Sequence, residues 1–376
     1  MTWRLPRLGV GLALLLAAGC GSQTAPSAPP TLQVQTAPLA TSLVTAQGTW
    51  AVAVMGGSAA SENNFWQLFV RPTGASRWSL ATPEGVADNG GLVAAGGARG
   101  TSLLVGFRPS QDLTFSPLAT SSDTGKNWTP GLLDADLADV PDAIAVGPSG
   151  RVLALLHDGS IEVAAAAAAA TAGQWSRLTT LGALAASAPG RGCGLVAVNA
   201  VSFGQNQDPV AGGSCVRRGV AGVFADNGGT WQAAGPAMPT GFDGDQVQVL
   251  GLASTTQGQA ALLEAGGSLL AAWSDGASWT VSAPVTASGI RASGFGPGGS
   301  AWVLLGGGRA ETIAAPGGSW HPLPAAPSGT ATLAPGTGGY DALAVAGSRL
   351  TVWQLGSAGW ANVQAINVPI VYGSSG

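Results

Sequence analysis

The chain has 376 residues and a net charge of −4 at pH 7, with 46% hydrophobic and only 9% charged residues. This length suits two average domains or one large all-β domain, and so little charge leaves salt bridges a small part in stability. No cluster of cations would neutralise a phosphate backbone, so we expect no nucleic-acid partner.

The first residues have the layout of an export signal. Arg4 and Arg7 form a short basic region, and an apolar run follows from Leu8 to Ala18. This run is too short to span a bilayer, which takes about 20 apolar residues. It leads into Leu16-Ala17-Ala18-Gly19-Cys20, which resembles the lipobox of bacterial lipoproteins. The alternative is an ordinary secretory signal followed by an incidental cysteine.

The lipobox resemblance implies a membrane anchor. Residues 1–19 would be removed as a lipoprotein signal peptide, and Cys20 would carry the lipid. Residues 20–41, rich in Pro, Ser and Thr, would then form a tether that holds the folded part off the membrane. We therefore expect an extracytoplasmic protein that is lipid-anchored to the bacterial cell membrane.

The cysteine count agrees with export. Lipidation of Cys20 leaves Cys193 and Cys215, which lie in one apolar stretch interrupted by the polar loop 204–208. Adjacent antiparallel strands would bring the two together, which predicts a disulfide; two buried thiols are the alternative. The pair Arg217-Arg218 follows in an expected strand or turn.

A repeat of tryptophans organises the rest of the chain. Each of seven tryptophans follows a Gly-rich or polar turn, and they are 50, 47, 56, 48, 41 and 40 residues apart: Trp78, Trp128, Trp175, Trp231, Trp279, Trp320 and Trp360. Blades of a β-propeller repeat every 40–50 residues or so, and short apolar runs between turns are typical of strands. Residues 42–376 therefore predict an all-β fold, a β-propeller with seven four-stranded blades; six or eight are the alternatives.

Two local features qualify this plan. The strand within residues 43–54 is expected to close the ring by pairing with the last blade. The alanine run 164–170 is expected to be an expansion in a hairpin loop, with a short surface helix as the alternative.

Three of the seven turns resemble the Asp-box, Ser-x-Asp-x-Gly-x-Thr-Trp, of sialidase-type propellers. The first keeps all but the threonine, the second keeps the second half, and the third has lost one spacer. Their residues are Ser121, Asp123, Gly125 and Trp128; Asp226, Gly228 and Trp231; and Asp275, Gly276 and Trp279.

The resemblance implies structural roles for these residues. The aspartate would cap its own turn, the glycine would take a positive φ, and the tryptophan would pack between blades. Sialidase activity would also need an arginine triad, a Tyr–Glu pair and an acid aspartate. The only tyrosines are Tyr340 and Tyr372, and the family's Arg-Ile-Pro motif is absent. We therefore assign no catalytic residue and no cofactor.

Other candidate chemistry is weak. The acidic stretches Asp134/Asp136/Asp139/Asp142 and Asp243/Asp245 fit solvated turns better than calcium sites, and the sequence predicts no metal site. His157 and His321 lie beside turn residues, and Gly306-Gly307-Gly308 lacks the Lys-Ser/Thr of a phosphate loop.

Three functions are compatible with these features. We expect first a cell-envelope lipoprotein that binds a surface protein or glycan without catalysis. The alternatives are an assembly factor for a membrane complex and a glycoside hydrolase of sialidase-like fold. The hydrolase would need a carboxylate pair about 5–10 Å apart, such as Glu264 with an aspartate.

Overall fold

The computed structural model describes residues 41–56, 64–83, 92–96, 103–107, 118–131, 141–255, 258–314, 316–336 and 338–369. All of them belong to one unit, Val34–Gly376. The predicted signal peptide and Cys20 lie outside the described residues, as does the predicted tether except Thr41, so lipidation stays a prediction. No helix in the described ranges has both the length and the apolar character to cross a bilayer.

Five antiparallel sheets each contain four strands that follow one another in the chain. The first holds β1 (Ser42–Thr45), β2 (Gly48–Gly56), β3 (Asn64–Pro72) and β4 (Ser79–Leu80). The second holds β5 (Leu92–Gly96), β6 (Leu103–Phe107), β7 (Leu118–Ser121) and β8 (Thr129–Pro130). The third holds β9 (Ala143–Val146), β10 (Val152–Leu155), β11 (Ile161–Ala164) and β12 (Ser176–Thr179).

The last two of these sheets lie toward the C-terminus. One holds β22 (Ala292–Phe295), β23 (Ala301–Leu304), β24 (Ala310–Ile313) and β25 (His321–Pro322). The other holds β26 (Thr330–Gly336), β27 (Gly339–Ala346), β28 (Arg349–Gly356) and β29 (Gly359–Asn367).

The remaining strands form a nine-stranded sheet between these groups. They are β13 (Leu195–Phe203), β14 (Pro209–Cys215), β15 (Gly222–Asn227), β16 (Thr230–Ala233), β17 (Val247–Thr255), β18 (Gly258–Ala265), β19 (Ser268–Ser274), β20 (Trp279–Val281) and β21 (Val285–Thr286). Its two meanders share a single strand-pairing position among the described residues, Ser214 opposite Gln248. Divided there, the described strands fall into seven four-stranded units, with β21 as an addition to one of them.

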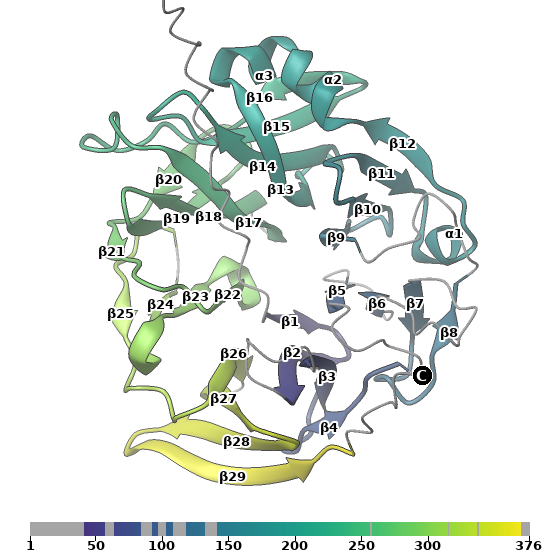
Figure 1. Ribbon diagram of the computed structural model, residues 1–376, viewed down its shortest axis with the longest axis vertical. Helices are drawn as coiled ribbons and strands as arrows, with labels where there is room; N and C mark the ends of the chain where they lie inside the picture. The colour runs from purple at the N-terminus through teal and green to yellow at the C-terminus, as the bar shows by residue number, and fades with distance from the viewer. Residues whose placement is uncertain are drawn as a thin grey trace, which may run out of the picture. The chain divides into compact units, whose positions relative to one another are not determined.

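The units follow one another around a ring (Figure 1). The first strand of each unit lies toward the centre and the last toward the outside, as β1 and β4 or β26 and β29 illustrate. This arrangement is that of a β-propeller, and the predicted all-β fold is confirmed.

The core lies between the sheets. One cluster combines Val52 and Leu68 of the first sheet with Val105 of the second. Another combines Phe69 of the first sheet with Leu343 of the last, so apolar packing continues across the closure of the ring. Strands covered on both faces read as continuous apolar runs, as in β2, whose first six residues are all buried.

The expected strand exchange at the closure was wrong. Residues 43–54 contribute to two strands, β1 and β2, which pair with each other, and the last sheet uses only β26 to β29. The reason is local, because the turn at Ala46 and Gln47 folds this segment back on itself, so each end of the chain completes its own sheet.

Short helices interrupt the strands at a few places. α1 (Ala167–Thr171) occupies the end of the alanine run, as in the short-helix alternative. α2 (Leu181–Ala186) and α3 (Ala188–Cys193) lie between β12 and β13, and the side chains of Thr180 and Ser187 cap their N-termini. The 3₁₀ turns η2 (Pro297–Gly299) and η3 (Gly306–Gly308) contain glycines with positive φ.

Candidate functional site

The first Asp-box turn is held by its own aspartate. The Asp123 Oδ1 accepts a hydrogen bond from the backbone N–H of Asn127 at 3.0 Å, and Oδ2 accepts from Asn127 Nδ2 at 2.6 Å. The Ser121 hydroxyl donates to Asp123 Oδ1 and accepts from Gly125 N, both at 2.9 Å. The bonds from Asn127, above all the backbone one, lower the pKa of Asp123 from 3.8 to about 2. The carboxylate is a turn cap.

The other two boxes differ in turn length. Asp275 Oδ1 accepts from the backbone N–H groups of Ala277 and Ser278 at 2.9 and 2.8 Å, so this aspartate also caps its turn. Asp226 instead lies inside β15, opposite Trp231, and its buried Oδ1 has no hydrogen-bond partner among the described residues. The expected cap at Asp226 therefore does not form.

Turn length explains the difference between the boxes. In the second box only Gly228 and Gly229 lie between the paired strands β15 and β16, with φ of 61° and 89°. Both residues of such a two-residue hairpin take positive φ, which suits glycine. The aspartate two positions before Gly228 is thereby drawn into the strand.

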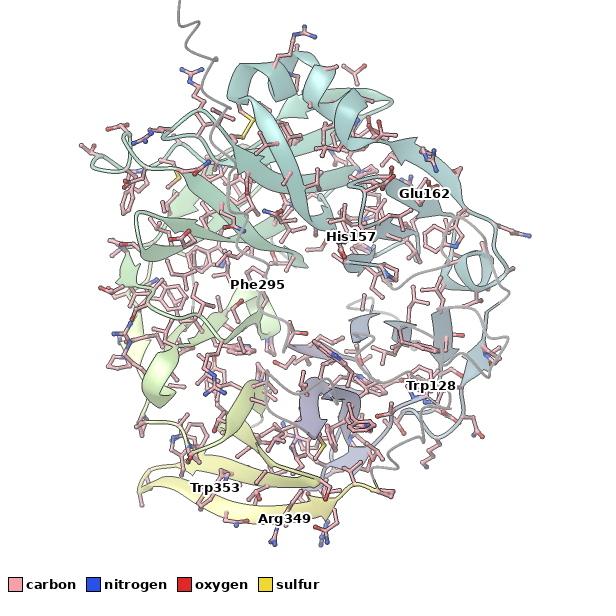
Figure 2. The ribbon with its side chains drawn as sticks, viewed as in Figure 1. Trp128, His157, Glu162, Phe295, Arg349 and Trp353 are labelled. Atoms are coloured by element: carbon pink, nitrogen blue, oxygen red, sulfur yellow. A yellow bond between two sulfur atoms is a disulfide. The ribbon has the colours of Figure 1, made fainter. Side chains whose placement is uncertain are left out.

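Four of the seven repeated tryptophans donate a hydrogen bond to the preceding unit along the chain, whereas the Trp175 indole N–H donates to Ala170 O at 2.9 Å within its own unit. The indole N–H of Trp128 donates to Ala81 O at 3.0 Å, and that of Trp279 donates to Ala234 O at 2.7 Å. Each acceptor is the third residue after the tryptophan of the preceding unit. Trp320 and Trp360 likewise reach back to Ser282 Oγ and Pro324 O, at 3.2 and 3.0 Å. These side chains are staples between units, and Trp128 is labelled in Figure 2.

At the closure of the ring, the repeated tryptophan Trp78 belongs to a buried polar cluster. The Trp78 indole N–H donates to Asp341 Oδ2 at 2.8 Å, and Arg71 forms an ion pair with the same carboxylate. The Gln364 side chain accepts from Trp78 N at 2.8 Å and donates to Trp78 O at 2.7 Å, as a neighbouring strand would. Arg71 also donates to Pro335 O at 3.2 Å. Burial raises the pKa of Asp341, against the bonds from Trp78 and Arg71.

Two residues considered for glycoside hydrolysis, Glu264 and Tyr340, make hydrogen bonds within the scaffold. Glu264 Oε1 accepts from Gly267 N at 3.1 Å and caps the β18–β19 turn. The Tyr340 hydroxyl is 2.6 Å from Thr312 Oγ1, and burial raises the pKa of this phenol. A sialidase-type nucleophile would be paired with a glutamate instead. Tyr372 lies outside the described residues.

Asp142 lies in a bend and His157 in a turn, whereas His321 lies in the strand β25. Asp142 Oδ1 is 3.6 Å from His157 Nδ1, and the His157 side chain is 92% exposed. The other acidic residues of that stretch, from 134 to 139, lie outside the described ranges. Within those ranges no group of three or more His, Cys, Asp or Glu side chains is arranged to hold a metal ion.

The described strands nearest the centre of the ring carry no Asp, Glu, Lys, Arg or His. They are β1, β5, β9, β13, β17, β22 and β26. Their residues are small, apolar or uncharged, and Phe295 at the end of β22 is labelled in Figure 2. The centre is therefore bounded by uncharged walls wherever these strands face it.

One surface segment is fixed covalently. Cys193 and Cys215 form the predicted disulfide, with Cα atoms 5.3 Å apart, which joins the end of α3 to the end of β14 and is drawn in yellow in Figure 2. Beyond it, Val216 N donates to Gly194 O and Arg217 N donates to Cys193 O, each at 2.9 Å. The disulfide and these two bonds hold the α3 end and the β14–β15 turn side by side.

Comparison with known proteins supports the fold at a distance. No protein-family model and no curated protein sequence matches the chain. A putative 6-phosphogluconolactonase from Bacteroides fragilis NCTC 9343 is similar in structure, with 13% identity, 86% of this chain and 96% of that chain covered, and a TM-score of 0.53. The chain is a β-propeller.

Two further similar structures lie below a TM-score of 0.5. YCF48 from Cyanidioschyzon merolae has 16% identity, covers 89% of this chain and 97% of its own, and has a TM-score of 0.46. The structure described as "YCF48 bound to D1 peptide" has 14% identity, covers 77% and 82%, and has a TM-score of 0.44.

The arginines around the disulfide were not predicted to lie together. Arg191 lies two residues before Cys193, and Arg217 lies two residues after Cys215. A disulfide between the two cysteines necessarily brings their neighbours close, so the predicted bond itself was the available signal. The buried pair of Arg71 with Asp341 had no such signal in the sequence.

Proposed function

We propose that this protein acts by binding a protein partner at the outer surface of the cell membrane, to which a lipid on Cys20 attaches it. The observation that carries the proposal is that four of its carboxylates are bound to other groups of the scaffold. Asp123, Asp275 and Glu264 cap turns, and Asp341 is paired with Arg71. These groups stabilise the scaffold, which supports a binding role.

A protein partner fits the exposed surface better than a glycan does. The exposed large hydrophobic side chains of the described residues are aliphatic: Leu80, Val196, Val216 and Val363. Sugar rings stack on flat aromatic faces, whereas here indole groups of the repeated tryptophans are held between units. Apolar and arginine side chains are both frequent in protein interfaces.

Assembly of a membrane complex would be one form of this binding, with a membrane protein as the partner. A lipid anchor would place the propeller where such a partner is inserted.

The proposal is tested with the full chain purified from membranes in detergent. It is immobilised and presented in parallel with cell-wall polysaccharide and with detergent-solubilised membrane proteins, and released reducing sugar is measured in both. We expect saturable retention of a membrane protein and no released sugar. Sugar release would contradict the proposal, and retention of polysaccharide alone would replace the protein partner with a glycan.

The anchor is tested separately. Replacing Cys20→Ser should abolish incorporation of labelled palmitate and move the chain from the membrane fraction to the soluble fraction. An unchanged membrane association would show that the chain is held there by something other than a lipid on Cys20.

A further inference from the structure

Three exposed arginines surround the disulfide. Arg191 lies on α3, and Arg217 and Arg218 lie in the β14–β15 turn. Their guanidinium groups bond only to backbone carbonyls among the described residues: Arg191 to Ala186 O, Arg217 to Gly192 O at 3.5 Å and Arg218 to Gly244 O at 2.8 Å. None forms an ion pair within those ranges, unlike Arg71 and Arg177. Most of their donors therefore remain open to solvent.

Two exposed valines accompany these arginines. The side chains of Val216 and Val196 belong to residues that are 56% and 37% exposed. Val196 is the extra residue of a bulge, because Leu195 pairs with Cys215 and Ala197 with Ser214. A bulge redirects the side chain that it carries, here away from the core. We call Arg191, Val196, Val216, Arg217 and Arg218 the arginine platform.

The platform is preorganised. Its two segments are joined by the disulfide, and Gly194, the C-cap of α3, has φ of 68° and lies against Val216. A side chain at Gly194 would bring its Cβ to 3.3 Å from Val216 Cβ. Little ordering of the backbone is left to take place on binding, which favours affinity.

The acidic neighbours lie on one side only. Gly219 N donates to Asp245 O at 2.8 Å, and Arg218 reaches Gly244 between Asp243 and Asp245. Arg218 therefore lies in a mixed-charge setting. Arg191 and Arg217, at the α3 end, have no carboxylate within ion-pair distance in the described residues, and they supply the positive charge of the platform.

We propose that the arginine platform binds an acidic segment of a protein partner, with an apolar side chain of that segment against Val216. This inference rests on the proposed binding function and adds the surface and the chemistry of the partner. A guanidinium donates paired hydrogen bonds to a carboxylate, which a lysine ammonium cannot match in geometry. Arginines beside apolar groups are frequent anchors of interfaces.

The test measures fluorescence anisotropy of a labelled synthetic peptide in which glutamates flank valines, titrated with the full chain in detergent. The variant is Arg191→Gln/Arg217→Gln. The matched control is Arg77→Gln/Lys126→Gln, which removes the same charge from two exposed residues beside other turns. We expect the platform variant to bind at least about tenfold more weakly and the control to bind as wild type. Added salt should weaken the wild-type complex.

Three results would overturn the inference. If the platform variant binds the peptide as tightly as wild type does, the acidic segment binds elsewhere. If both variants lose the same affinity, the binding depends only on net charge. The third is binding to phosphatidylglycerol vesicles, but not to the peptide, that is lost in the platform variant; it would assign the platform to anionic lipid.

Failure of the inference is distinguishable from failure of the proposed function. If the platform variant retains the membrane protein that wild type retains, the function stands and the platform is wrong. If wild type retains no protein, the proposed function itself fails, whatever the peptide does.

Discussion

At the scale of single residues, the aspartate of the Asp-box has different hydrogen-bond partners in different turns. Asp123 reaches backbone N–H groups because its turn is long enough to fold back over the carboxylate, whereas Asp226 is drawn into a strand by a two-residue turn. The motif predicted a cap in both. Turn length, which the letters do not carry, decides which aspartate reaches its donors.

The capping role of Asp123 has a pH signature. Its pKa is lowered from 3.8 to about 2, so its contribution to stability is present above pH 3.8 and is lost as the pH falls through about 2. Asp123→Asn keeps the Oδ1 acceptor but removes the titration. We expect the melting temperature of wild type to fall more steeply between these pH values than that of the variant. Thermal unfolding followed by circular dichroism measures both, and parallel curves would contradict the capping role.

A second prediction concerns Gly125, whose φ is 75°. A Cβ at this position would lie 2.6 Å from Ala81 Cβ of the neighbouring unit, so both the backbone and the packing require glycine. Gly125→Ala should lower the free energy of unfolding by at least about 1 kcal/mol. Gly74→Ala is the control, because its φ is 79° but no atom lies within 4 Å of the added Cβ. An equal loss of unfolding free energy in both variants would show that backbone strain alone, and not the contact with Ala81, explains the effect.

At the scale of elements, the tryptophan repeat predicted the units because the same contact recurs at Trp128, Trp279, Trp320 and Trp360. The indole of each staple needs an acceptor in the preceding unit, and that acceptor follows the preceding tryptophan by a nearly fixed number of residues. The helices α2 and α3 were not predicted, because each is six residues long and glycines interrupt the segment. Their capping residues, Thr180 and Ser187, were the available signal.

The staples can be tested one at a time. Trp279→Phe removes the indole N–H that donates to Ala234 O and leaves most of the ring, so it should cost about 1 kcal/mol more than the lost volume does. Trp353→Phe is the control; its side chain is half-buried and shows no hydrogen bond in the described residues. Denaturant unfolding of both variants gives the difference, and equal losses would exclude a stapling bond.

The disulfide should contribute more. It closes a loop with a sequence separation of 22 residues, which corresponds to about 3 kcal/mol in the chain-entropy model. Cys193→Ala/Cys215→Ala should lose this amount, and the wild type should lose a similar amount under reducing conditions. If reduction leaves the unfolding midpoint unchanged, the bond has no part in holding the segment.

At the scale of the whole molecule, the described residues close the ring by side-chain contacts and one backbone hydrogen bond, from Gly56 N to Gly347 O, and not by a shared strand. Arg71 and Asp341 are 270 residues apart, and no local pattern in the sequence marks them as partners. The repeat predicted that a ring forms. Only the structure shows that a buried ion pair, a tryptophan and a glutamine amide join its ends.

The closure predicts a large and specific loss. Arg71→Met leaves Asp341 buried without its cation and should lower the free energy of unfolding by about 3 kcal/mol or more. Arg71→Met/Asp341→Asn removes both charges and should recover much of this loss. A double-mutant cycle by denaturant unfolding measures the coupling, and additive losses would contradict a direct role for the pair.

The most direct test of binding through the arginine platform is photo-crosslinking in intact cells. A photoreactive residue is placed at Val216 of the full chain, and at Val363, an exposed position on β29, as the control. We predict a protein adduct at Val216 that disappears in the Arg191→Glu/Arg217→Glu background, and none at Val363. A chain that forms no protein adduct at Val216, or one that charge reversal leaves intact, would contradict the proposal.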